Sequence, residues 1–149
     1  MTLQDWANNQ WLRPHKTSAE EINNLLAIVA RDQEDASSKD ISVDWRFGIA
    51  YNAALKLCTI LLYSEGYRAE RAHQHYRTIQ ALPLILGEAY KPDADYLDAC
   101  RKKRNIVEYD YVGGVTEHDA DELIQFTKEL HEKILNRLKT RYPNLIKTK

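Results

Sequence analysis

The sequence predicts an all-α protein, an antiparallel up-and-down bundle of four to five helices. Apolar residues recur with helical spacing through most of the 149 residues. No stretch alternates between apolar and polar residues for long enough to form a strand. Residues typical of helix starts and ends, among them Ser18, Gly66 and Thr116, separate the periodic stretches.

Length and composition indicate a single helical domain over residues 1–149, long enough to bury roughly two-thirds of its unfolded surface. We expect a short docking helix at 2–12 and the bundle itself at 18–141. Cys58 and Cys100 both fall inside predicted helices, and there is no Cys-x-x-Cys, no charged-then-apolar leader and no unbroken apolar run near 18 residues. These features predict a reduced, soluble, cytoplasmic protein that does not bind a membrane.

The first two helices follow from their caps and apolar spacing. Thr2 is a candidate N-cap for the docking helix, which carries Trp6 and Trp11 and ends before Arg13-Pro14. Ser18 with Glu21 predicts a capping box that opens a helix over 18–36.

The central helix is predicted from Asp44 to Glu65, the most apolar part of the chain, with Gly66 as its left-handed cap. One of its faces comprises Trp45, Ile49, Ala53, Leu57, Ile60 and Leu61. A less regular helix is expected from Ala69 to Leu86, broken or kinked at Pro83 and closed by Gly87.

Two more helices complete the bundle. Pro92-Asp93 opens the first, which is expected to end at Gly113-Gly114. Thr116 caps the last helix, with Asp119 three residues later in a weak capping box, and its apolar stripe continues to about Arg141.

The residues that say most about the function of the chain lie between positions 96 and 115. On a helix, five residues fall within an arc of about 80°: Leu97, Cys100, Arg104, Val107 and Tyr111. A guanidinium cannot lose its charge, and burying it without a partner costs free energy. Arg104 therefore either extends to solvent along the core, pairs with a carboxylate, or binds an anionic ligand.

A polar ridge lies beside this seam. Arg101, Asn105 and Tyr109 are spaced at i, i+4 and i+8, and Glu108 lies one turn after Arg104. Ile106 falls on the opposite side of the helix, which indicates that a second copy covers it in a homodimer, unless it is an isolated surface residue.

Another basic group precedes Pro83, where Arg71, His73, His75 and Arg77 alternate. Such a pattern suggests metal or phosphate binding, but the rings of a His-x-His on a helix point about 200° apart, so we expect no shared metal. Ala72, Tyr76, Ile79 and Leu82 form an ordinary amphipathic face on the same helix. No motif for a metal, a nucleotide phosphate or another cofactor occurs in the sequence. The net charge of −1 argues against coating of nucleic acid by bulk electrostatics.

The stretch Arg104-Asn105-Ile106-Val107-Glu108-Tyr109-Asp110-Tyr111 resembles the motif of the HEPN superfamily of small helical bundles. That motif is an arginine, commonly followed by a polar residue, then four to six positions and a histidine. The HEPN toxins that partner minimal nucleotidyltransferases have a version ending in histidine, any residue, tyrosine. Arg104, Asn105 and Tyr111 match this version, whereas Tyr109 stands where the histidine would be. The resemblance covers about 18–140.

The resemblance implies a metal-independent endoribonuclease of toxin or defence type that works without a cofactor. Arg104 would bind the RNA phosphate with help from Arg101, while Asn105 and Tyr109 orient it. Tyr111 would be modified by a nucleotidyltransferase-type partner, unless it is simply a core aromatic. Tyrosine replaces histidine poorly, because bringing a phenol pKa from about 10 to near 7 needs roughly 4 kcal/mol.

Two further interpretations remain open. The chain can be a non-catalytic, dimeric HEPN-fold interaction module in which Arg104 is structural and paired with Glu108 or another carboxylate. It can also be a helical bundle that binds a nucleotide or another small ligand.

Overall fold

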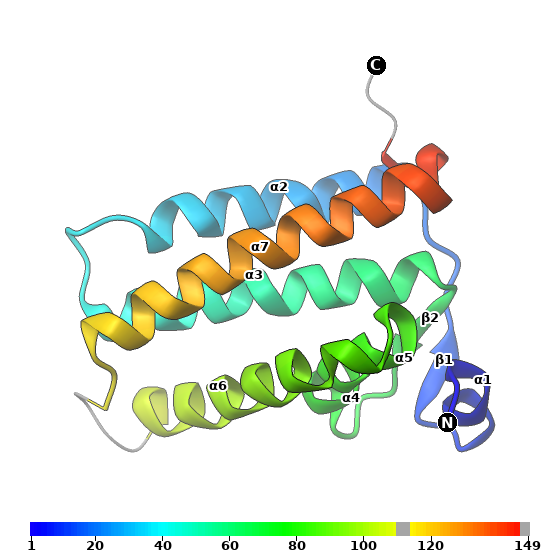
Figure 1. Cartoon of the computed structure of the whole chain (residues 1–149), viewed down its shortest axis with the longest axis horizontal. Helices are drawn as coiled ribbons and strands as arrows, with labels where there is room; N and C mark the ends of the chain where they lie inside the picture. The colour runs from blue at the N-terminus through cyan, green and yellow to red at the C-terminus, as the bar shows by residue number, and fades with distance from the viewer. Residues whose placement is uncertain (110–113, 147–149) are drawn as a thin grey trace.

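The computed structural model describes residues 1–109 and 114–146, without the side chains of residues 106–109. Four long helices dominate it: α2 (Ala19–Ala36), α3 (Val43–Ser64), α6 (Lys91–Tyr109) and α7 (Glu117–Arg141). They run alternately up and down in chain order (Figure 1). The predicted all-α antiparallel bundle is confirmed.

Helix α3 forms the centre of the bundle. It packs against α2, α6 and α7, and Ala50, Ala53 and Ala54 are almost fully buried where its neighbours approach. By length and composition alone, α3 is long and apolar enough to cross a membrane. However, 67% of its most apolar window is buried inside the protein. Most of the apolar surface of α3 therefore lies in the core of the bundle.

The N-terminal segment differs from its prediction. Helix α1 (Leu3–Asn8) is shorter than expected, and the chain then forms strand β1 (Leu12–Pro14). This strand pairs antiparallel with β2 (Tyr67–Ala69), with Leu12 opposite Ala69. The expectation of no strand is wrong here, because strands of three residues are too short to show a period of two. Trp6 is buried, its ring contacts that of Trp11 edge-on, and it belongs to a buried cluster with Leu62 of α3, so the segment packs on the helices.

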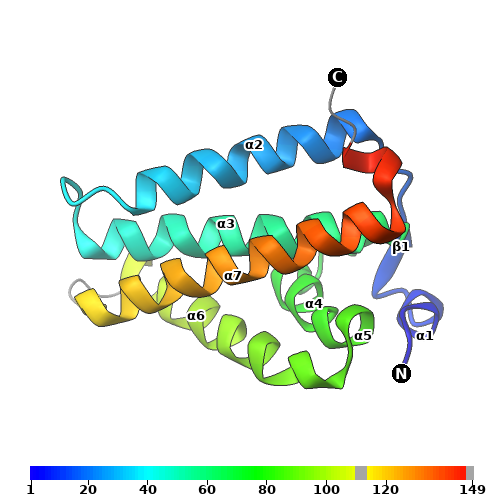
Figure 2. The same ribbon diagram turned by 45° about the horizontal axis from the view of Figure 1, so that its top comes forward.

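The region predicted as one helix over 69–86 contains two short helices, α4 (Gln74–Gln80) and α5 (Leu82–Leu86), followed by the short helix η1 (Glu88–Tyr90). The break before Pro83 is confirmed. Ala72 and Tyr76 are exposed and not part of the core, because the helix starts only after residue 73. Figure 2 shows α4, α5 and α6 on one side of α3, with α2 on the other.

The end of the chain adds η2 (Pro143–Ile146) after α7. Thr116 and Asp119 form both halves of the predicted capping box at the start of α7. At the start of α2 only half of the predicted box forms. Ser18 accepts from the amide of Glu21, but the Glu21 carboxylate instead contacts Thr17 and His15.

The first turn of α3 contains a second correction. Trp45 was placed on a core face but is 62% exposed. Its neighbour Arg46 is buried in its place. The Arg46 guanidinium donates to the carbonyl of Ala36 and to the carboxylates of Glu117 and Asp121. This three-way contact fixes the rotation of α3 so that residue 46 faces inward.

Candidate functional site

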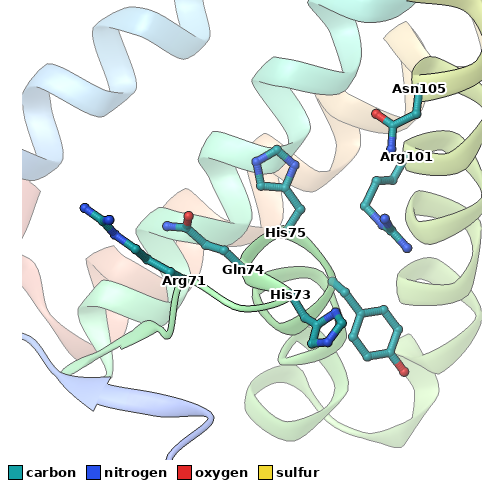
Figure 3. A pocket seen from close by; sticks show the side chains of 7 residues that line it. Arg71, His73, Gln74, His75, Arg101 and Asn105 are labelled. Atoms are coloured by element: carbon teal, nitrogen blue, oxygen red, sulfur yellow. The ribbon is translucent and has the colours of Figure 1, made fainter. Parts of the chain in front are cut away.

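A cavity of about 540 Å³ lies between α6 and the beginning of α4. Its lining combines basic, amide and aromatic side chains: Arg71, His73, Gln74, His75, Tyr76, Arg101 and Asn105. Figure 3 shows His75 on one wall of the cavity and Arg101 and Asn105 on the wall that α6 contributes. The structure thus brings two residues of the predicted site next to histidines that lie about 30 positions earlier in the chain.

Arg104 lies in the same turn of α6 as the cavity-lining residues Arg101 and Asn105, on the side of the helix that faces α3. It is partly buried, and its Cζ atom is 5.5 Å from the centroid of the Tyr51 ring. Tyr51 itself is 1% exposed, and its ring centroid is 6.4 Å from that of His75. Arg104 and His75 therefore share one buried aromatic neighbour, so the positive charge of Arg104 lies close to the cavity.

Arg101 is partly neutralised and held in position. Its Nε donates to Asp98 at 2.8 Å, and its Cζ is 6.0 Å from the ring centroid of Tyr76. Lys102, 67% exposed, also lies 3.5 Å from Asp98. Lys103 instead donates to Asp119 on α7 at 2.9 Å. The side chains of the four consecutive cations at 101–104 therefore lie in different surroundings. Arg101 faces α4, and Arg104 faces α3.

The two histidines differ in conformation and environment. His73 has a left-handed backbone, with φ 58°, and stands at the N-terminus of α4 without capping it. This conformation is uncommon for a residue other than glycine, and such residues are frequent at binding sites. His75 keeps an exposed edge but is partly desolvated. That desolvation, followed by the charges of Arg104, Arg101 and Lys56, lowers the pKa of His75 below its usual 6.5.

The cavity is suited to an anion. Guanidinium groups and the Asn105 amide donate hydrogen bonds, and a neutral imidazole can accept a proton. Figure 3 shows the rings of His73 and His75 pointing in different directions. In the part of the chain that the structure describes, no group of three or more His, Cys, Asp or Glu residues could hold a metal ion.

Two residues of the predicted site fall outside this description. The backbone of Tyr109 belongs to α6, but its side chain lies outside the described residues, as does Glu108. Tyr111 lies outside them entirely. Arg101, Arg104 and Asn105 are thus the predicted site residues that the structure places.

Sequence reasoning missed the contribution of α4. The alternation of basic residues from Arg71 to Arg77 indicates metal or phosphate binding, and the divergent ring directions argue only against a shared metal. The phosphate interpretation was not developed into a site. That Tyr51 lies next to Arg104 depends on helix packing, for which the sequence contains no local signal.

Comparison with protein-family models, with curated proteins and with solved structures gives no match to this chain.

Proposed function

We propose that the protein is a HEPN-like RNA-binding protein and a metal-independent endoribonuclease of toxin or defence type, acting as a cytoplasmic homodimer. The observation that carries this proposal is the cavity in which Arg101 and Asn105 of the motif helix face His75, with Arg104 beside it. The motif resemblance is the second support.

The cavity fits an RNA phosphate better than a carboxylate or a neutral ligand. Arginine binds phosphate oxygens in a planar, two-pronged arrangement and stabilises charge that develops on phosphate during transfer. Arg101 remains partly exposed although it is paired with Asp98, so it can still reach an anion. Tyr76 at the lining is 38% exposed and offers a ring on which a base could stack.

Substitution of Arg104 tests the proposal. We expect Arg104→Ala to lower the rate of cleavage of single-stranded RNA, assayed in EDTA, by about 10²-fold or more, because one group that stabilises the phosphate is lost. The control is Arg31→Ala, which removes an exposed arginine from α2 and should leave the rate unchanged. Equal cleavage by a folded Arg104→Ala variant would remove Arg104 from the mechanism.

The alternative is a non-catalytic, dimeric HEPN-fold interaction module, favoured by the packing of Arg104 on the buried ring of Tyr51. In that case Arg104→Ala should lower the melting temperature, and the wild-type protein should leave RNA intact. A nucleotidyltransferase-type partner that modifies Tyr111 also belongs to our proposal. Mass spectrometry of the protein after co-expression with such an enzyme would detect or exclude the modification.

A further inference from the structure

The cavity contains one group whose chemistry differs from that of its neighbours. The arginines can only donate hydrogen bonds, whereas a neutral imidazole can take up a proton. His75 lies in the first turn of α4, lines the cavity together with Arg101 and Asn105, and has its ring 6.4 Å from that of Tyr51. Arg104 lies over the same Tyr51 ring at 5.5 Å, and its positive charge acts on the imidazole of His75.

The charges that act on His75 are those of cations on the two helices that flank it, α6 and α3. From α6 it is influenced by Arg101 and Arg104, and from α3 by Lys56. Arg71 and His73 line the same cavity. The carboxylate of Asp98 on α6 is paired with Arg101 at 2.8 Å and with Lys102 at 3.5 Å. Desolvation and these charges both lower the pKa of His75 below its usual 6.5, so the neutral imidazole predominates at pH 7 and can accept a proton.

We propose that His75 is the proton acceptor that activates the 2′-hydroxyl of an RNA substrate bound in this cavity. The inference rests on the proposed function and identifies a group that the motif helix lacks, since Tyr109 stands at the position of the motif histidine. A phenol is almost fully protonated at pH 7, whereas a neutral imidazole is already in the accepting form.

The step balances as a transesterification. His75 takes the proton of the 2′-hydroxyl, and the 2′-oxygen forms a bond to the adjacent phosphorus. The bond from phosphorus to the 5′-oxygen breaks, and that oxygen takes a proton from water. The products are a 2′,3′-cyclic phosphate and a 5′-hydroxyl end, and the imidazolium returns its proton to solvent. Arg104 and Arg101 stabilise the charge on the phosphate.

The arrangement distinguishes His75 from the other cavity histidine. His73 precedes α4 in a left-handed conformation, and Figure 3 shows its ring directed away from that of His75. Only His75 of these two contacts the Tyr51 ring that Arg104 also covers. A substitution at position 75 should therefore affect proton transfer without removing the guanidinium groups that bind the phosphate.

The test uses the full-length chain with His75→Gln, which preserves polarity and approximate size but cannot accept the proton. We expect RNA cleavage to fall by about 10²- to 10⁴-fold, the usual effect of losing a general base. Affinity for an RNA with 2′-deoxyribose at the cleaved position, which binds but cannot react, should change less than about threefold. The matched control is His118→Gln, at an exposed histidine of α7, which should retain the wild-type rate.

Two further measurements separate proton transfer from a structural role. The wild-type cleavage rate should rise with pH to a plateau, with the midpoint of the rise below pH 6.5, because the unprotonated imidazole is the active form. His75→Gln should lose this rising limb. Added imidazole should restore part of the activity to His75→Gly, as a merely structural role would not permit.

The outcomes distinguish this inference from the function it rests on. Cleavage by His75→Gln at the wild-type rate, or a wild-type profile without the rising limb, overturns the role of His75 while leaving a ribonuclease. Wild-type protein that neither binds nor cleaves RNA overturns both. If His75→Gln does not fold, the wild-type pH profile and the imidazole rescue still decide the question.

Discussion

Arg46 is a buried cation whose guanidinium is held by hydrogen bonds to three other residues. Its side chain is 3% exposed, and it links the last turn of α2 to the first turns of α3 and α7. The carbonyl of Ala36 belongs to the C-terminal end of α2, where backbone acceptors lack helical partners. The guanidinium satisfies that carbonyl and is itself stabilised by two carboxylates.

We expect Arg46→Met to lower the free energy of unfolding by about 1–3 kcal/mol, because a buried carbonyl loses its donor while methionine retains much of the side-chain volume. Urea denaturation measures the change. The carboxylate partners are more than half exposed, so Glu117→Gln should cost less than about 1 kcal/mol. A larger loss for Glu117→Gln than for Arg46→Met would contradict this account.

At the scale of single residues, the direction of a side chain was predicted correctly where the periodicity of one helix determines it. The prediction failed where packing between helices determines which residue faces the core. The inward direction of Arg104 follows from helical periodicity alone. Helical periodicity does not decide whether Trp45 or Arg46 faces the core, because either residue could occupy the inner position. Their order depends on the Ala36 carbonyl and on carboxylates about 70 positions later in the chain.

At the scale of elements, the start of α7 is joined to α6 through Asp119. This carboxylate accepts from the Thr116 amide as part of the capping box and from Lys103 of α6 at 2.9 Å. The Lys103 hydrogen bond and the Thr116 amide lower the pKa of Asp119 below its usual 3.8. One side chain thus caps a helix and ties it to its neighbour.

This lowered pKa predicts a pH dependence of stability. The folded state holds Asp119 ionised more strongly than the unfolded state does, so the stabilisation is complete above pH 3.8 and disappears as pH falls through the lower folded-state value. Asp119→Asn should therefore cost about 1 kcal/mol at pH 7 and progressively less below pH 3.8. Thermal melts from pH 2 to 7 test this, with Glu129→Gln on the exposed face of α7 as control.

The long helices were predicted closely because apolar spacing and side-chain caps coincide at their ends. The limits of α2, α3 and the described start of α6 lie within about two residues of expectation. The short elements around residues 9–16 and 66–74 were missed. Strands β1 and β2 stabilise each other across more than 50 positions, and three-residue strands carry no periodic signal. The sequence predicted only part of the site. The cavity residues on α6 follow from helical periodicity, whereas the position of the cavity residues at the start of α4 depends on the region that was missed.

At the scale of the whole molecule, basic and acidic side chains gather on different sides of α6. The cavity towards α4 is lined by Arg71, Arg101 and two histidines. A second cavity of about 500 Å³ towards α7 is lined by acids that include Asp93 and Glu122. The net charge of −1 hides this separation. An RNA strand should therefore approach α6 from the α4 side, because the other side repels phosphate.

The same separation of charge leads to a prediction about the homodimer. Helix α6 lies at a margin of the bundle and packs on α3, α4 and α5, so its outer side can meet a second copy (Figure 1). In the homodimer that we propose, a two-fold contact there would bring two cationic cavities together, and their repulsion would weaken the free dimer.

Salt and bound RNA should both relieve that repulsion. We therefore expect the dimer dissociation constant to fall severalfold between 50 and 300 mM salt, or on addition of RNA with 2′-deoxyribose at the cleaved position, because each adds negative charge between the cavities. Sedimentation velocity at micromolar protein measures this, with Arg101→Ala expected to strengthen the free dimer and reduce its salt dependence. A chain that stays monomeric even with RNA bound would show that one copy forms the whole site, and the two-protomer arrangement would have to be abandoned.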